Sequence, residues 1–211
     1  MKGLTQDEQL DGQPADSRDA ILVAACRAVA EQGIRGMRLE AVAREAGVSV
    51  PLVYYHFESR PGLIRAVLRY VGAAAPSEVL RERPPGFSAY EALEAALISE
   101  IDDEPRVRDA SVIWGEVNAS AVFDPKLRDE LRRVNRAWSA LVAEAIESGI
   151  ADGSVDPTVD PAVAAELLIS LVDGLCARWL GGTLEVERAR RLVAAALRAA
   201  LAPRRASDSI E

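Results

Sequence analysis

The stretch RLEAVAREAGVSVPLVYYHFESRPGL, residues 38–63, decides the fold of this chain. Leu39, Val42, Ala43 and Ala46 recur at helical spacing and predict a helix over residues 39–46. Gly47 marks the end of that helix, because glycine takes a positive φ without steric penalty. A small residue, a glycine four positions later and an apolar residue ten positions later predict two short helices that cross at about 90–120°.

The second of these helices is predicted over residues 50–57. Ser49 stands where a side-chain oxygen caps the first turn, and Pro51 lies in that turn, where a missing N–H costs nothing. Val53 and Phe57 are four residues apart and are expected to face inward. The segment therefore predicts a helix-turn-helix, with an ordinary helical hairpin as the alternative.

The motif extends to the preceding helix RDAILVAACRAVAEQG (18–33) and, with VYYHFESR (53–60), resembles the N-terminal domain of the TetR family of bacterial transcriptional regulators. The resemblance covers about a quarter of the chain. It implies three helices, with a fourth leading into a ligand-binding domain. It also implies a homodimeric repressor that leaves a palindromic operator in double-stranded DNA when an unidentified small-molecule effector binds.

The resemblance places a set of side chains against DNA, where phosphate contacts position the protein and base contacts specify sequence. Arginine, tyrosine, histidine and serine side chains suit phosphate oxygens, and the leucine suits a thymine methyl group. The set is Arg38, Ser49, Val50, Pro51, Leu52, Tyr54, Tyr55, His56 and Arg60. At the start of the helix over 39–46, Arg38 stands where the family often has a threonine or serine, so a capping hydroxyl is absent.

Charge is distributed in agreement with this interpretation. The chain has a net charge of −8, which by itself argues against DNA binding. Residues 17–70, however, carry eight basic and five acidic side chains, so this segment is positive and the acidity lies elsewhere. A dimer would present two such segments.

The whole sequence predicts an all-α protein. We expect a polar tail over 1–16, a helix-turn-helix domain over 17–62, a larger helical ligand-binding and dimerisation domain over 63–203, and a tail over 204–211. Ser88 with Glu91 predicts a capping box, and Asp124-Pro125 and Asp160-Pro161 each predict a helix start. The sequence has no apolar run long enough to span a membrane and no apolar leader, so a cytoplasmic location is expected.

The last two predicted helices, 161–180 and 184–201, have broad apolar faces that predict burial on two sides. Two such helices from each of two subunits would form a four-helix interface. The residues expected there are Leu167, Leu168, Leu171, Leu175, Leu192, Val193 and Leu197.

The middle helices are expected to enclose an effector pocket, since ligand sites are mainly apolar with few polar groups. The three tryptophans would suit a flat or cationic ligand, and ordinary core packing is the alternative for each. The candidate residues are Trp114, Asn118, Phe123, Trp138, Asp173, Cys176 and Trp179. The segment VDPAVAAELLISLVDGL (159–175) and the helix after it resemble the ligand domain of betaine-regulator-type members.

Enzymatic alternatives find little support in the sequence. Asp102-Asp103-Glu104 resembles a metal-binding motif of helical prenyl-transfer enzymes, but Arg106 stands where a further carboxylate is required. The acidic loop at 152–160 lacks the glycine and glutamate of a calcium loop. No metal site and no cofactor are expected. A transcriptional activator, or a regulator without a ligand, remains an alternative to the repressor.

Overall fold

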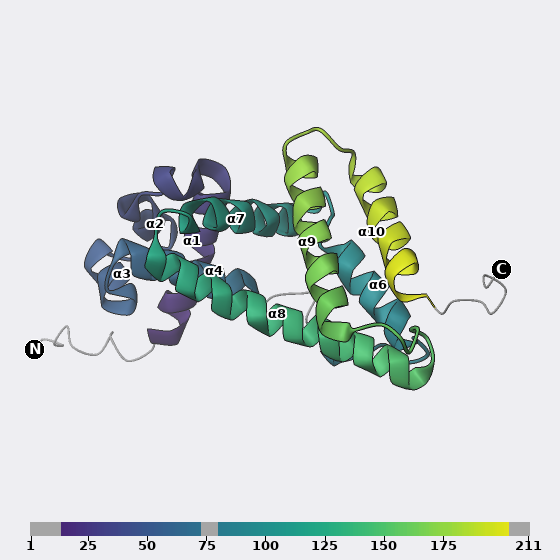
Figure 1. Ribbon diagram of the computed structural model, residues 1–211. Coiled ribbons are helices and arrows are strands. Elements are labelled where there is room, and N and C mark those ends of the chain that lie inside the picture. Colours follow the sequence, from purple (N-terminus) through teal and green to yellow (C-terminus); the bar gives the residue numbers. More distant parts are fainter. Residues whose placement is uncertain (1–13, 73–79, 203–211) are drawn as a thin grey trace, which may run out of the picture.

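The computed structural model of the protein describes residues 14–72 and 80–202, and all regular elements within these ranges are helices. The predicted all-α fold is therefore confirmed. Figure 1 shows α7 and α8 running from the N-terminal helices to the C-terminal ones. The elements are α1 (Pro14–Gly36), α2 (Leu39–Glu45), α3 (Val50–Phe57), α4 (Arg60–Gly72), α6 (Ala89–Ser99), α7 (Pro105–Ala121), α8 (Pro125–Asp152), α9 (Pro161–Leu180) and α10 (Val186–Leu201).

Helix starts follow the capping residues found in the sequence. Asp124 accepts hydrogen bonds from the amides of Lys126 and Leu127 at the start of α8, and Asp160 does the same for α9. Ser88 and Glu91 form the predicted capping box of α6. One boundary differs, because α1 begins at Pro14, inside the segment predicted as a tail. The remainder of that tail and the predicted tail over 204–211 lie outside the described residues.

The helices enclose two apolar cores. The first core lies among the four helices from α1 through α4, the C-terminal part of α7 and the start of α8. It includes Leu63, Val67, Val117 and Leu131. The second joins α6, α9 and α10 with the C-terminal half of α8. The expected domain limit at residue 62 falls inside the first core, since the apolar face of α4 packs there. The helix α8 contributes to both cores and, at about 1.5 Å per residue, is about 42 Å long.

A buried carboxylate fastens α4 to α8. Glu130 on α8 is 4 % exposed and accepts a hydrogen bond at 3.1 Å from Arg69 on α4. Arg133, one turn further along α8, pairs with the same Glu130 oxygen. A buried charge is tolerated where it is paired in this way. Within the described ranges, no helix has both the length and the apolar character needed to cross a membrane.

Candidate DNA interface and effector site

The first candidate site is the outer surface of α2 and α3. The backbone at Gly47 has φ 68°, and the Val48 amide donates to the Ala43 carbonyl at 2.9 Å, which closes the turn between these helices. Ser49 caps α3 by accepting from the Leu52 amide at 3.4 Å. Because the α3 residues Val53 and Phe57 are buried as predicted, the opposite face of α3 is turned outward.

The exposed face of α3 presents aromatic and polar groups. Tyr55 is 79 % exposed and Tyr54 is 48 % exposed, although both are large apolar rings. Pro51 and the Ser49 cap are exposed as well, while Leu52 and Val50 are half-buried. An exposed pair of tyrosines has no role in the core of this subunit, so it is available for contact with another molecule.

A shallow hollow of about 480 Å³ lies beside this face, where α2 begins. Arg35, Arg38, Tyr54 and Arg60 contribute to its wall. Arg38 is exposed and makes no side-chain cap for α2, in keeping with the missing hydroxyl. The sequence prediction omitted Arg35, although its place three residues before Arg38 could have indicated it. Glu40 also lines the hollow, but the three arginines and the phenol outnumber it and suit a phosphate group.

Two members of the predicted set have partners inside the subunit. The Arg60 guanidinium donates to the carbonyl of Met37 at 3.2 Å and to the carbonyl of Ile34. Arg60 therefore supports the loop between α1 and α2, which differs from the free phosphate contact expected of it. The Nε2 atom of His56 lies 3.1 Å from the Ser17 hydroxyl, so this ring ties α3 to α1.

The second candidate site lies between α7 and α9. The indole nitrogen of Trp114 donates to the Asp173 carboxylate at 3.1 Å. One turn along α9, the Cys176 thiol donates to the Glu100 carbonyl at 3.7 Å. These contacts bring together three residues of the predicted effector set from two helices, and they add Glu100, which the prediction missed.

The Glu100 side chain is the unusual group of this second site. Burial and, to a smaller extent, the nearby Asp173 carboxylate together raise its pKa to about 7. Burial also raises the pKa of Asp173, against the effect of the Trp114 hydrogen bond, although Asp173 keeps part of its surface accessible. In the described part of the chain, no hydrogen bond or ion pair reaches the Glu100 carboxylate. The half-buried Glu100 carboxylate thus lies near the more accessible Asp173 carboxylate.

Other members of the effector set lie apart or are already engaged. Phe123 is 81 % exposed in the turn between α7 and α8, nine residues or about 13 Å along the axis from Trp114, so its predicted place in a pocket is wrong. Trp179 donates to Asp103 at 3.1 Å and stacks with Arg108 at 5.6 Å. Trp138 packs against the second core, and the Asn118 amide donates to the Trp114 carbonyl of its own helix.

The cysteines have the properties of buried thiols. Burial raises the pKa of Cys176 to about 12 and that of Cys26 to about 11. The thiolate is the reactive form of cysteine, so both side chains are inert near neutral pH. Cys176 accordingly contributes its shape and a weak donor to the second site.

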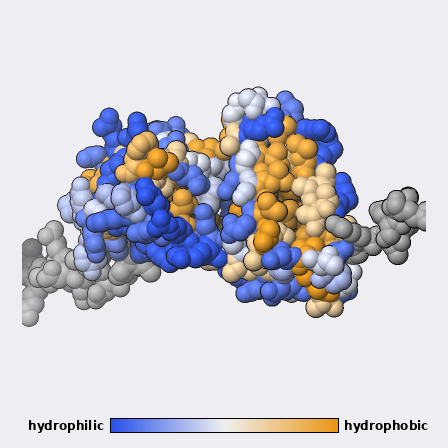
Figure 2. Space-filling view, in the orientation of Figure 1, coloured by the Kyte–Doolittle hydropathy of each residue, from blue (hydrophilic) through white to orange (hydrophobic). Residues whose placement is uncertain are grey.

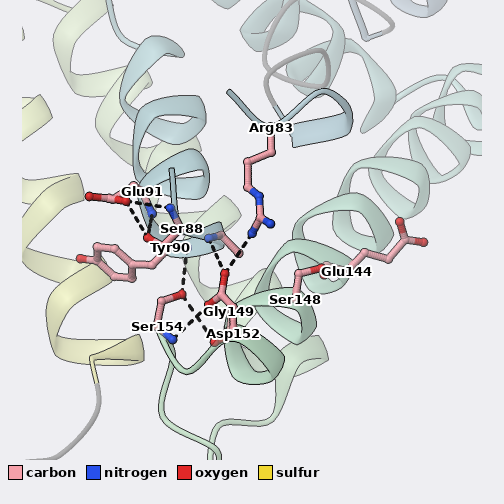
Figure 3. A network of polar contacts seen from close by, with 10 residues as sticks. Arg83, Ser88, Tyr90, Glu91, Glu144, Ser148, Gly149, Asp152 and Ser154 are labelled. Carbon is pink, nitrogen blue, oxygen red and sulfur yellow. Dashed lines mark hydrogen bonds and ion pairs between the residues drawn. The ribbon is translucent and has the colours of Figure 1, made fainter. Parts of the chain in front are cut away.

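A further hollow of about 390 Å³ lies between α6 and α8. Its polar edge is Asp152, which accepts from Arg83 at 2.9 Å and from the Ala89 amide at 2.9 Å (Figure 3). Ser154 and Ala89 hydrogen bonds lower the pKa of Asp152 to about 2. The contacts of Asp152 and Ser154 with Arg83, Ala89 and Tyr90 join the start of α6 to the end of α8, so this network serves the fold.

The predicted interface leucines divide into two groups. Leu168, Leu175, Val193 and Leu197 are at most 5 % exposed within a single subunit, so their assignment to the subunit interface is corrected. They form the contact between α9 and α10 and their neighbours. Leu167 is 64 % exposed, and Leu171 and Leu192 retain accessible surface.

Comparison with known proteins agrees with this arrangement. Residues 21–67 match the family model described as bacterial regulatory proteins of the tetR family, and residues 89–202 match the BetI-type transcriptional repressor C-terminal model. The HTH-type transcriptional regulator BetI of Burkholderia mallei is 30% identical over 81% of this chain and 83% of its own length.

Solved structures give the same result. A TetR-family transcriptional regulator from Rhodococcus sp. is 39% identical, with a TM-score of 0.83 over 90% of this chain and 100% of its own. A transcriptional regulator from Saccharomonospora viridis in complex with choline is 25% identical, with a TM-score of 0.78 over the same shares. The fold and the helix-turn-helix thus define a DNA-binding transcriptional regulator. The chain belongs to the TetR family, with a BetI-type C-terminal domain. It is a regulator rather than an enzyme.

Proposed function

We propose that the chain is a homodimeric repressor that binds a palindromic operator through α3 and leaves it when a small organic cation binds between α7 and α9. Operator contact is assigned to the exposed face of α3 and to the hollow beside it. Tyr54, Tyr55, Arg35 and Arg38 are the accessible groups that carry this assignment. Pro51 and Leu52 adjoin them, while Arg60 and His56 support the surface from within.

The proposed dimer uses the outer face of α9 and α10. Figure 2 shows apolar surface gathered over these two helices, on the side away from the N-terminal helices. Val163 is 55 % exposed and Leu167 is 64 % exposed, both on α9. Water-exposed apolar surface of this kind marks an interaction site. A two-fold axis there would relate two helix-turn-helix domains, called reading heads below. Half-sites one DNA turn apart require a separation of about 34–36 Å between the two reading heads.

The proposed effector is a cation because of the pair of carboxylates. Glu100 and Asp173 lie in a place where burial disfavours their charge, and a bound cation would favour it. The Trp114 indole beside them is suited to a quaternary ammonium group. Asp173 keeps accessible surface, so the site is open at α9. The choline complex of the regulator from Saccharomonospora viridis supports this chemical class.

The observation that carries the effector proposal is the Glu100 carboxylate, desolvated and without a described partner. The test selects an operator from random duplexes and measures the dissociation constant with choline, tetramethylammonium or 3,3-dimethyl-1-butanol, the neutral isostere of choline. We expect the cations to weaken operator binding at least about tenfold and the neutral alcohol to leave it unchanged. Glu100→Gln and Asp173→Asn should remove the response, while Glu144→Gln, an exposed carboxylate on α8, should retain it.

The outcomes separate the parts of the proposal. An equal effect of cation and alcohol, or no effect of either cation on a protein that binds its operator, overturns the cationic effector. Failure to enrich any sequence, or binding that does not weaken with salt, overturns the assigned DNA interface.

A further inference from the structure

The junction between α1 and α2 contains a break in the helix. Gly33 has φ 70° and ψ 167°, which lies outside helical geometry and interrupts α1 three residues before its end. The buried Ile34 follows immediately, and its amide cannot join the regular hydrogen-bond pattern of the helix. This amide therefore needs an acceptor from elsewhere.

Glu116 of α7 supplies that acceptor. Its Oε2 atom accepts from the Ile34 amide at 2.8 Å, across 82 positions of sequence. The same carboxylate lies against Gly33 so closely that a Cβ on this glycine would be 2.8 Å from Oε2. A carboxylate-to-amide bond is among the stronger hydrogen bonds in proteins. Glu116 thus holds the junction by direct contact with its backbone.

Ile34 is also connected to the helices of the helix-turn-helix. Its carbonyl accepts from Arg60, whose Nε also donates to the Met37 carbonyl at 3.2 Å. Arg60 is the first residue of α4 and comes three positions after Phe57, the end of α3. The peptide groups of Ile34 therefore link α7 to the start of α4 and hence to α3.

The same helix also contacts the proposed effector site. Trp114 is two residues before Glu116 and donates to Asp173 of α9. The helix α7 packs against both α1 and α9. Movement of α7 at Trp114 would therefore be carried to the junction at Glu116.

We propose that Glu116 is the positioning residue through which α7 sets the orientation of the DNA-reading helices, and that the Glu116–Ile34–Arg60 contacts carry the response to the effector. The first half stands independently, and the second rests on the proposed function. The effector would shift the population towards dimers whose heads are wrongly placed only if it favours that position of α7.

The test compares Glu116→Ala and Glu116→Gln with Glu144→Ala, an exposed glutamate on α8, using the selected operator. Glu116→Ala should weaken operator binding about tenfold, while Glu116→Gln, which keeps an acceptor, should stay within about threefold of wild type. In a double-mutant cycle with Arg60→Ala, most of the Glu116→Ala effect should disappear, because the two residues act through the same peptide groups. Hydrogen exchange at the Ile34 amide should be faster in Glu116→Ala than in wild type, and unchanged in Glu116→Gln and Glu144→Ala.

A second measurement concerns coupling. The ratio of operator dissociation constants with and without choline should fall towards one in Glu116→Ala. Additive effects of Glu116→Ala and Arg60→Ala, or wild-type operator affinity in the folded Glu116→Ala dimer, overturn the positioning role. A wild-type protein that ignores choline but shows the non-additive cycle would reject the cationic effector and leave the positioning role standing. An unchanged choline ratio in Glu116→Ala overturns the transmission of the response.

Discussion

At the scale of single residues, the two candidate sites place charge in opposite ways. The reading head keeps Arg35 and Arg38 accessible, because a phosphate backbone is met at the protein surface. The site between α7 and α9 keeps Glu100 half-buried, and burial disfavours its charge unless a counter-charge binds. The exposure of each group therefore indicates the kind of partner that each site takes.

One prediction concerns the hollow beside α3 that Arg35, Arg38, Tyr54 and Arg60 line. Arg38→Ala should weaken binding to all duplexes by a similar factor, since a phosphate contact carries no sequence information. The slope of log affinity against log salt should become shallower by about 2 per dimer, one released counterion for each head. Titrations at several salt concentrations measure this slope. Arg136→Ala, an exposed arginine on α8, should leave the slope unchanged.

Another prediction at this scale concerns Glu100 and pH. Its folded pKa of about 7 lies above the ordinary glutamate pKa of 4.5, so the folded state binds more protons than the unfolded state between these pH values. The stability contributed by the neutral acid is present below about pH 4.5 and is lost as pH rises through about 7. At pH 8, the free energy of unfolding measured in urea should therefore be higher for Glu100→Gln than for wild type, by at most about 3 kcal/mol. At pH 5 the difference should shrink to about 1 kcal/mol, and a constant difference at both pH values would contradict the prediction.

At the scale of elements, α7 is the helix that links the two sites. It contributes Ile113 and Val117 to the first core, Trp114 to the contact with α9, and Glu116 to the junction of α1 and α2. A helix packed on several sides moves as a rigid rod, because interiors are close-packed. A displacement of α7 at its contact with α9 would therefore also displace its contact with the junction of α1 and α2.

A pair of glycine substitutions tests the junction. Gly33 has φ 70° and ψ 167°, a backbone conformation essentially restricted to glycine, so Gly33→Ala should destabilise the protein by roughly 1–3 kcal/mol. Gly47→Ala has nearly the same φ, 68°, but an added Cβ meets no atom within 4 Å. Urea unfolding should show the larger loss for Gly33→Ala. Equal losses would contradict the expected cost of the Gly33 backbone conformation.

At the scale of the whole molecule, the apolar face of α9 and α10 gives the two reading heads a common frame. Leu167→Glu places a charge in the proposed interface and should convert the dimer to monomers in sedimentation equilibrium. Phe123→Glu is the matched control, since Phe123 is also exposed but lies in the turn between α7 and α8. Monomers should lose operator affinity far beyond the loss of one contact, because two half-sites are then bound separately. A Leu167→Glu dimer of unchanged stability would place the interface elsewhere.

Much of the fold could be predicted because it depends on local signals. Ser49, Asp124 and Asp160 act within three residues of themselves, so their capping roles follow from the sequence and were confirmed. Arg60 and Glu100 could not be assigned in this way. The hydrogen bonds of Arg60 reach back 23 and 26 positions, and the environment of Glu100 depends on α9.

The sequence by itself determined the helices, most of their limits, the helix-turn-helix and the family, because periodicity, caps and turn residues are local properties of the chain. Only the tertiary structure decided which apolar residues of α9 and α10 belong to the subunit core and which remain at the surface. It also decided that Glu100 joins Asp173 and Trp114, that Phe123 lies outside, and that Glu116 reaches Ile34. These contacts join residues far apart in sequence, and they exist only once helix packing has fixed which face each helix turns to its neighbour.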